Sequence, residues 1–210
     1  MNNFKSILRF FFVVFLVLNF TGCNNTERIM FEITYDSSLG LESYNGRLLL
    51  MITKDTLKEP RFQINDSNET GIIIGKNVQQ WIPGQKESFN SSVKAYPIEE
   101  LNQLKSGTYF VQALLHKYET FNLSNGYKVQ LPMDQGEGQH WNTSPKNIYS
   151  KPIKIEFDKS NKRPIEIVIT EEIPSIKPVK DSKYIKHVKI KSKLLSEFWG
   201  RPMYVQANVL

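Results

Sequence analysis

The fold is decided by the stretch Leu101-Asn102-Gln103-Leu104-Lys105-Ser106-Gly107-Thr108-Tyr109-Phe110-Val111-Gln112-Ala113-Leu114-Leu115. A leucine-bearing turn and a glycine lead into an apolar run that opens with Thr-Tyr, and this pattern predicts a buried β-strand. Immunoglobulin-like sandwiches often have a tyrosine at such a corner, where its hydroxyl bonds to the upstream backbone. Tyr109 is the candidate for that corner, and ordinary packing within the strand is the alternative.

The sequence on both sides of this strand predicts further short strands, separated by Gly, Pro and polar turns. The expected strands are 29–35, 46–52, 60–64, 72–74, 78–82, 127–131, 153–157 and 164–170. Residues 98–104 have the pattern of a helical turn, and residues 132–149 that of a long polar loop. Many short strands without a long amphipathic helix predict an all-β protein, an immunoglobulin-like antiparallel β-sandwich over residues 29–172.

Residues 173–210 are expected to be a C-terminal extension. Pro174 and Pro178 make its first part extended and stiff, which indicates a linker. The final run, 202–210, has the pattern of a strand, and we expect it to lack a partner.

The N-terminus has the layout of a bacterial lipoprotein signal. Lys5 and Arg9 supply the positive region, and residues 10–18 are wholly apolar. This apolar run is shorter than the about 20 residues that a membrane-spanning helix needs. The run Phe20-Thr21-Gly22-Cys23 follows and resembles the lipobox that the lipoprotein signal peptidase cleaves, with Phe20 in place of the usual leucine.

That resemblance implies that residues 1–22 are removed and that Cys23 is lipidated. Residues 23–28 would then be a tether, and the partner of the lipid is a membrane of the bacterial cell envelope, at the outer membrane or the periplasmic face. A plain secretory signal with an unrelated thiol is the alternative. Because Cys23 is the only cysteine, lipidation leaves no thiol for a disulfide or a nucleophile.

The composition predicts no nucleic-acid partner. The formal net charge is +6, and removal of Lys5 and Arg9 lowers it. We expect the lysines to be spread along the chain, without the arginine-rich block that is typical of nucleic-acid binding.

The sequence predicts no catalytic residue, no cofactor and no metal. It contains no Gly-x-Ser-x-Gly elbow of a serine hydrolase. His116, His140 and His187 are far apart, without the spacing of metal ligands. Ester hydrolysis by this chain alone is therefore not expected.

One polar stretch is a candidate ligand-binding loop. Asp134, Glu137, His140 and Trp141 combine two carboxylates, an imidazole and an indole among flexible glycines. The alternative is a solvated loop whose Trp141 folds back on the edge of the sandwich.

Several blocks resemble a family of bacterial exported proteins described as esterases. They are Gly46-Arg47-Leu48-Leu49-Leu50-Met51, Glu59-Pro60-Arg61-Phe62-Gln63-Ile64, Gly107 to Leu115, Leu131 to Gln139, and Phe198-Trp199-Gly200-Arg201-Pro202-Met203-Tyr204. In that family, a β-rich N-terminal domain precedes an α/β-hydrolase domain.

The resemblance implies a lipid-anchored, non-catalytic N-terminal module that tethers or supports a hydrolase domain absent from this chain. Residues 182–210 would be the entry to that domain, and a separately encoded hydrolase would be the partner. A cell-envelope binding module for a glycan or a protein is the alternative function. An independent hydrolase that uses the 134–141 loop is a third.

Overall fold

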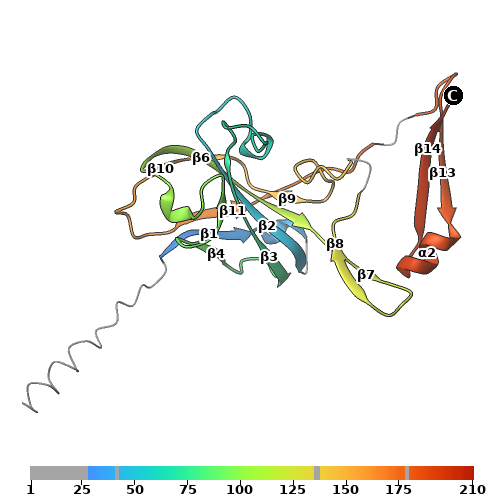
Figure 1. The fold of residues 1–210 in the computed structure, drawn as a ribbon, viewed down its shortest axis with the longest axis horizontal. Coiled ribbons are helices and arrows are strands. Elements are labelled where there is room, and N and C mark those ends of the chain that lie inside the picture. The colour runs from blue at the N-terminus through green and yellow to red at the C-terminus, as the bar shows by residue number, and fades with distance from the viewer. Residues whose placement is uncertain (1–27, 41–42, 135–137, 178–179) are drawn as a thin grey trace, which may run out of the picture.

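The computed structural model describes residues 28–40, 43–134, 138–177 and 180–210. The predicted signal peptide, Cys23, most of the tether and Glu137 lie outside the described residues. The protein is mostly β, with several antiparallel sheets and one α-helix in the described part of the chain (Figure 1). No helix in this part is both long enough and apolar enough to cross a membrane.

The elements follow one another as short strands joined by turns. The strands are β1 (Ile29–Tyr35), β2 (Tyr44–Thr53), β3 (Ile72–Trp81), β4 (Glu87–Asn90), β5 (Ala95–Tyr96), β6 (Gly107–Lys117), β7 (Glu119–Asn122), β8 (Lys128–Leu131), β9 (Ile148–Tyr149), β10 (Ile153–Phe157), β11 (Ile165–Ile169), β12 (Glu171–Glu172), β13 (Lys186–Ser192) and β14 (Met203–Val209). The helices are the 3-10 turns η1 (Ser37–Leu39), η2 (Pro60–Phe62) and η3 (Leu101–Gln103), and α2 (Lys193–Trp199).

Two sheets form the body of the molecule. A three-stranded sheet has the order β11-β1-β4, and a seven-stranded sheet has the order β12-β9-β6-β2-β3-β5, with β10 also paired to β6. The described strand pairs are antiparallel except for β1 and β11, which run parallel. The hairpin β7–β8 and the ribbon β13–β14 are separate two-stranded sheets.

The main hydrophobic core receives side chains from both of these sheets. Phe31 and Ile33 come from β1, and Leu48, Leu50 and Val111 come from β2 and β6. The other face of β2 is buried as well, in a second core cluster of Leu49, Met51, Leu114 and Ile173. A strand that is buried on both faces is apolar at successive positions, and this explains the run Leu48 to Ile52.

Tyr109 makes the predicted corner bond. Its hydroxyl donates to the backbone oxygen of Lys105 at 3.0 Å, and its ring packs edge-on against Phe157, with 6.5 Å between ring centroids. The side chain therefore ties the turn before β6 to the core.

We expect Tyr109→Phe to lower the free energy of unfolding by about 1 kcal/mol, because it removes this hydrogen bond and keeps the ring. Urea denaturation measures the change. Tyr127→Phe is the control, since Tyr127 is 71% exposed, and equal stability of the two variants would contradict the role of the corner bond.

Several sequence-based expectations need correction. The strand expected over 60–64 does not form: Pro60–Phe62 is the turn η2, because Pro60 lacks a ladder donor and the Arg61 N–H donates to the side chain of Gln112 at 3.0 Å. The two strands predicted over 72–82 are one strand, β3. The sequence missed the short strands β4, β5, β7, β9 and β12. The final strand, β14, is not unpartnered, because it pairs with β13 along its whole length.

A partly buried polar network holds η2 on the outer face of the seven-stranded sheet. Glu59 accepts hydrogen bonds from Arg61 Nε at 2.9 Å and from Gln112 Nε2 at 2.8 Å. Arg61 also donates to the backbone oxygen of Asn142, at 3.2 Å. Gln112 is fully buried and donates further to the backbone oxygen of Ser150, at 2.9 Å. The network therefore joins η2, β6 and the loop before β10.

The molecule is elongated, and the start of β1 lies far from the C-terminal strands. In Figure 1, the start of β1 is near one end of the long axis, while β13, α2 and β14 lie at the other end.

Candidate functional site

The candidate site lies on the C-terminal unit, residues 180–210, which consists of β13, α2 and β14. The helix begins after Ser192, whose side chain accepts from the Leu195 N–H at 3.3 Å, and it ends at Gly200 in the left-handed conformation, with φ 64°. The strands on either side pair antiparallel, from Lys186 opposite Val209 to Ser192 opposite Met203. The unit is thus a two-stranded ribbon closed by one short helix.

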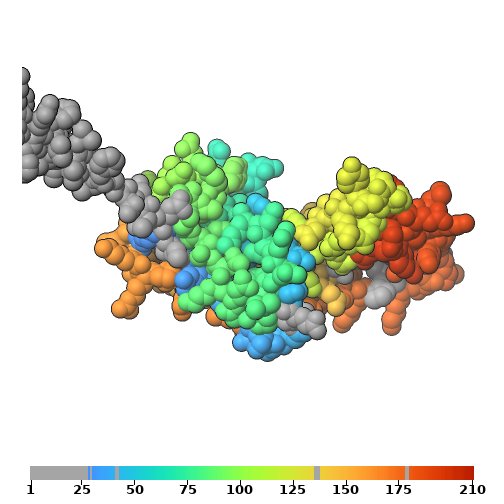
Figure 2. Space-filling view, turned by 90° about the horizontal axis from the view of Figure 1, so that it is seen from below, coloured from blue at the N-terminus to red at the C-terminus, as the bar shows by residue number. Residues whose placement is uncertain are grey.

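The block Phe198 to Arg201 attaches this unit to the β7–β8 hairpin. The rings of Trp199 and Phe121 meet edge-on, with 5.0 Å between centroids. Arg201 pairs with Glu119, and its guanidinium lies over the Phe121 ring, 4.8 Å from the centroid. A Cβ atom at Gly200 would lie 2.7 Å from the backbone oxygen of Asn122, so glycine permits this close contact. Figure 2 shows the hairpin packed against the unit.

An aromatic groove of about 520 Å³ opens where the hairpin, the following loop and the C-terminal unit meet. Its lining residues are Phe121, Leu131, Pro132, Met133, Asp134, Gln139, Trp199, Met203, Tyr204 and Gln206. The lining combines aromatic and aliphatic side chains with a carboxylate and two amides. This composition is typical of small-ligand sites, which are mostly apolar with a few polar groups.

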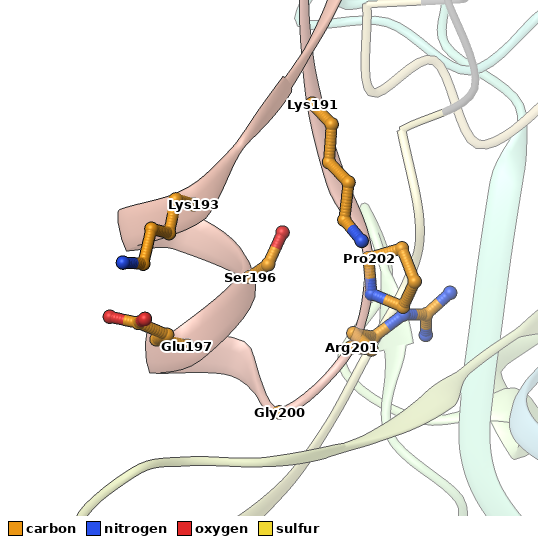
Figure 3. Close-up of a pocket in the computed structure, with 7 residues that line it drawn as sticks. All are labelled: Lys191, Lys193, Ser196, Glu197, Gly200, Arg201 and Pro202. Carbon is orange, nitrogen blue, oxygen red and sulfur yellow. The ribbon is translucent and has the colours of Figure 1, made fainter.

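A basic pocket of about 540 Å³ lies at the same end of the ribbon, lined by Lys191, Lys193, Ser196, Glu197, Gly200, Arg201 and Pro202 (Figure 3). The Lys191 side chain extends toward Pro202 and Arg201, while Lys193 and Glu197 project from the helix on the other side. The Ser196 hydroxyl donates to the Ser192 backbone oxygen at 2.5 Å and accepts from the Met203 N–H at 2.9 Å. That hydroxyl therefore links the helix to the ribbon.

The residues of the predicted loop lie in different places. Asp134 lines the aromatic groove, whereas His140 is exposed. Trp141 is half-buried and packs against the second core cluster, where its backbone oxygen accepts from Asn147 Nδ2 at 2.8 Å. Trp141 therefore packs on the seven-stranded sheet. Glu137 lies outside the described residues.

The three histidines stay apart. His116 lies on β6 beside Tyr118, with 5.6 Å between ring centroids, and His187 on β13 contacts the Asn208 Oδ1 through Nδ1 at 2.6 Å. Within the described ranges, no three His, Cys, Asp or Glu side chains form a group that could hold a metal ion.

Lys117, a lysine of the seven-stranded sheet with a lowered pKa, lies outside the candidate site. Burial lowers the pKa of the Lys117 ammonium, and the nearby Glu172 carboxylate opposes this change. The ammonium lies over the Tyr44 ring, 4.4 Å from its centroid. Burial likewise raises the pKa of the Tyr44 hydroxyl. Lys117 lines neither the aromatic groove nor the basic pocket, so this shift reflects packing at the core edge.

Comparison with known proteins gives no relative, since no family model, no curated protein and no solved structure matches this chain. The site is therefore interpreted from its own chemistry. Sequence reasoning missed Phe121, Trp199 and Tyr204 as groove residues. The cluster of aromatic residues in Phe198 to Tyr204 was the available signal.

Proposed function

We propose that this chain is a lipid-anchored, non-catalytic module of the bacterial cell envelope that carries and orients an esterase-type hydrolase domain. The observation that carries the proposal is an exposed apolar face on the β13–β14 ribbon. The lipid on Cys23 is the proposed anchor, and the sandwich is the proposed support between the anchor and the hydrolase.

The apolar face follows from the register of the ribbon. Directly opposed residues of an antiparallel pair lie on the same face, and successive residues alternate. One face therefore bears Val188, Ile190, Met203, Val205, Ala207 and Val209, with Lys186 and Ser192 at its two ends. Ile190 is 62% exposed and Val205 is 52% exposed. A two-stranded ribbon is only marginally stable by itself, and a contiguous exposed apolar surface marks an interaction site.

A hydrolase sheet is the occupant that suits this ribbon. A ribbon can extend another sheet by pairing along its open edge. In an α/β domain, helices cover both faces of the sheet, so a helix of the hydrolase would cover the apolar face. The attachment through Trp199, Gly200 and Arg201 would then fix the orientation of the hydrolase relative to the sandwich.

The body is proposed to be an immunoglobulin-like sandwich. Two features support this assignment: the two sheets share one core, and Tyr109 makes the corner bond at the start of β6.

The proposal predicts that the purified mature chain does not hydrolyse p-nitrophenyl acetate above the buffer rate. Hydrolysis that persists through purification to homogeneity would overturn the non-catalytic assignment and favour an independent hydrolase.

The proposal also predicts a stable complex with an α/β-hydrolase, to be sought as a Gly-x-Ser-x-Gly reading frame in the adjacent DNA. Co-expressed chains should copurify, and Val205→Lys should abolish the complex, because it places a charge in the apolar interface. Val168→Lys is the matched control, since Val168 is 49% exposed on β11 of the sandwich. An equal effect of the two substitutions, or adjacent DNA without such a frame, would count against the proposal.

The second candidate function is a cell-envelope binding module for a glycan or a protein. The aromatic groove is the observation that favours it. The sequence pointed to Trp141 as a residue that would contact this ligand, but Trp141 packs against the second core cluster. Trp199 and Tyr204, which line the groove, are the proposed contact residues instead.

A further inference from the structure

We infer that the polar face of the β13–β14 ribbon and the adjoining aromatic groove together bind an acidic polysaccharide. This inference rests on the second candidate function and adds the chemical class of its ligand.

The polar face is opposite the apolar face of the ribbon. By the same register, it bears His187, Lys189, Lys191, Tyr204, Gln206 and Asn208. Tyr204 is 48% exposed, and the Lys189 ammonium lies over its ring, 4.7 Å from the centroid. Because Tyr204 and Gln206 also line the aromatic groove, the lysine-bearing face and the groove form one continuous surface.

The excess of cations over acids lies in this unit and its linker, and is not spread along the chain as we expected. Residues 177–210 contain the cations Lys177, Lys180, Lys183, Lys186, Lys189, Lys191, Lys193 and Arg201, against the acids Asp181 and Glu197. In the described part of this segment, the ion pairs are Lys186 with Asp181 and Arg201 with Glu119. Lys189, Lys191 and Lys193 therefore remain available for an anionic ligand.

The combination of groups suits a chain of uronic acids. Aromatic rings pack against the C–H faces of pyranose rings, and the amides of Gln139 and Gln206 can hydrogen-bond to hydroxyls. Ammonium groups pair with the carboxylate that each uronic acid carries. The groove volume, about 520 Å³, is within the usual range for small-ligand sites.

Two other anionic partners fit less well. An anionic bilayer would take up the apolar face, where the register places one lysine, Lys186, at the margin, whereas Lys189 and Lys191 lie on the opposite face. A nucleic acid is held best by arginines that pair bidentately with its phosphates, whereas the arginine of this surface, Arg201, is already paired with Glu119.

The test compares oligogalacturonate with its methyl ester, which has the same sugar backbone without the charges. Isothermal titration of the full mature chain at low salt should detect binding of oligogalacturonate. The methyl ester should bind about tenfold more weakly, because charge-assisted hydrogen bonds are lost. Added salt should weaken the binding of the acidic form.

Two variants locate the site. The double variant Lys189→Gln with Lys191→Gln should weaken oligogalacturonate binding about tenfold, and Tyr204→Ala should weaken both ligands by removing the stacking ring. Lys154→Gln is the control, since Lys154 is exposed on β10 of the sandwich. Thermal melting establishes that each variant is folded.

Each contrary outcome has a distinct meaning. Equal affinity for both ligands would overturn the acidic class and leave the binding function standing. No binding of either ligand would overturn the inference, while hydrolase copurification tests the first function separately. Unchanged binding by the double lysine variant would overturn the assigned site. Tighter binding to phosphatidylglycerol vesicles than to oligogalacturonate would overturn the choice of ligand.

Discussion

Gly46→Ala is expected to lower the free energy of unfolding by about 3 kcal/mol or more, because overpacking against a fixed backbone is costly. An added Cβ at this position would lie 2.2 Å from the backbone oxygen of His116. Gly46 is in β2, which pairs with β6 on one side and β3 on the other. Relief of the clash requires β2 and β6 to separate, and this would disturb both core clusters.

Urea denaturation of Gly46→Ala and Gly75→Ala separates this clash from a general effect of alanine. Gly75 lies in β3 of the same sheet, and its added Cβ would meet side-chain atoms, Arg47 Nε and Leu49 Cδ2, both at 2.9 Å. These ends can move, so we expect a loss of about 1 kcal/mol or less. Similar losses in the two variants would contradict the close approach of β2 and β6.

Arg61→Ala is expected to lower the free energy of unfolding by about 2 kcal/mol, because it removes a buried guanidinium and its charge-assisted hydrogen bonds, while the Glu59 side chain that loses its partner is 38% exposed. Arg61 is 9% exposed. Its guanidinium lies over the Tyr149 ring, 4.0 Å from the centroid, and pairs with Glu59. The substitution removes these contacts together with the hydrogen bond to the Asn142 backbone, so η2 and the 141–150 loop should loosen together.

Arg47→Ala is the matched control for the network. Arg47 lies on the exposed side of β2, where its side chain donates to Asn77 Oδ1 at 3.0 Å and to the Gly75 backbone oxygen at 3.2 Å. Exposed polar contacts of this kind contribute less than about 1 kcal/mol. Arg61→Lys should have an intermediate effect, since it retains the charge without the planar fork. If Arg61→Ala were as stable as Arg47→Ala in urea, the network would have no special role.

The strands that the sequence predicts well are those whose apolar pattern matches their burial. The predictions for β1 and β2 agree with the structure within two residues. The alternation of apolar and polar residues in β1 and the continuous apolar run in β2 can both be recognised in the sequence. The prediction at Pro60 to Ile64 was wrong because the alternation there resembles a strand. The bond that replaces strand pairing comes from Gln112, far away in the sequence.

The candidate site depends on long-range contacts that a sequence pattern does not contain. Trp141 and Trp199 both lie in sequence segments with polar residues, and the sequence pattern does not show which of them lines a groove. Which of them lines a groove depends on the packing of Phe121 against Trp199, which joins two distant segments. The pairing of β13 with β14 was missed for a related reason, because α2 separates the strands and the segment was assigned strand by strand.

β1 and the C-terminal unit lie at opposite ends of the long axis, so the β-sheet body separates them (Figure 1). In the proposed anchoring, lipid fixes the end near β1, so the length of the sandwich sets the height of the ribbon above the bilayer. Insertions in the sandwich loops would leave that height unchanged. Because Trp199 and Arg201 hold the C-terminal unit on the β7–β8 hairpin, loss of these contacts, rather than a longer linker, would free the ribbon to move. While they persist, the β-sheet body would keep the ribbon at a fixed distance from the lipid headgroups.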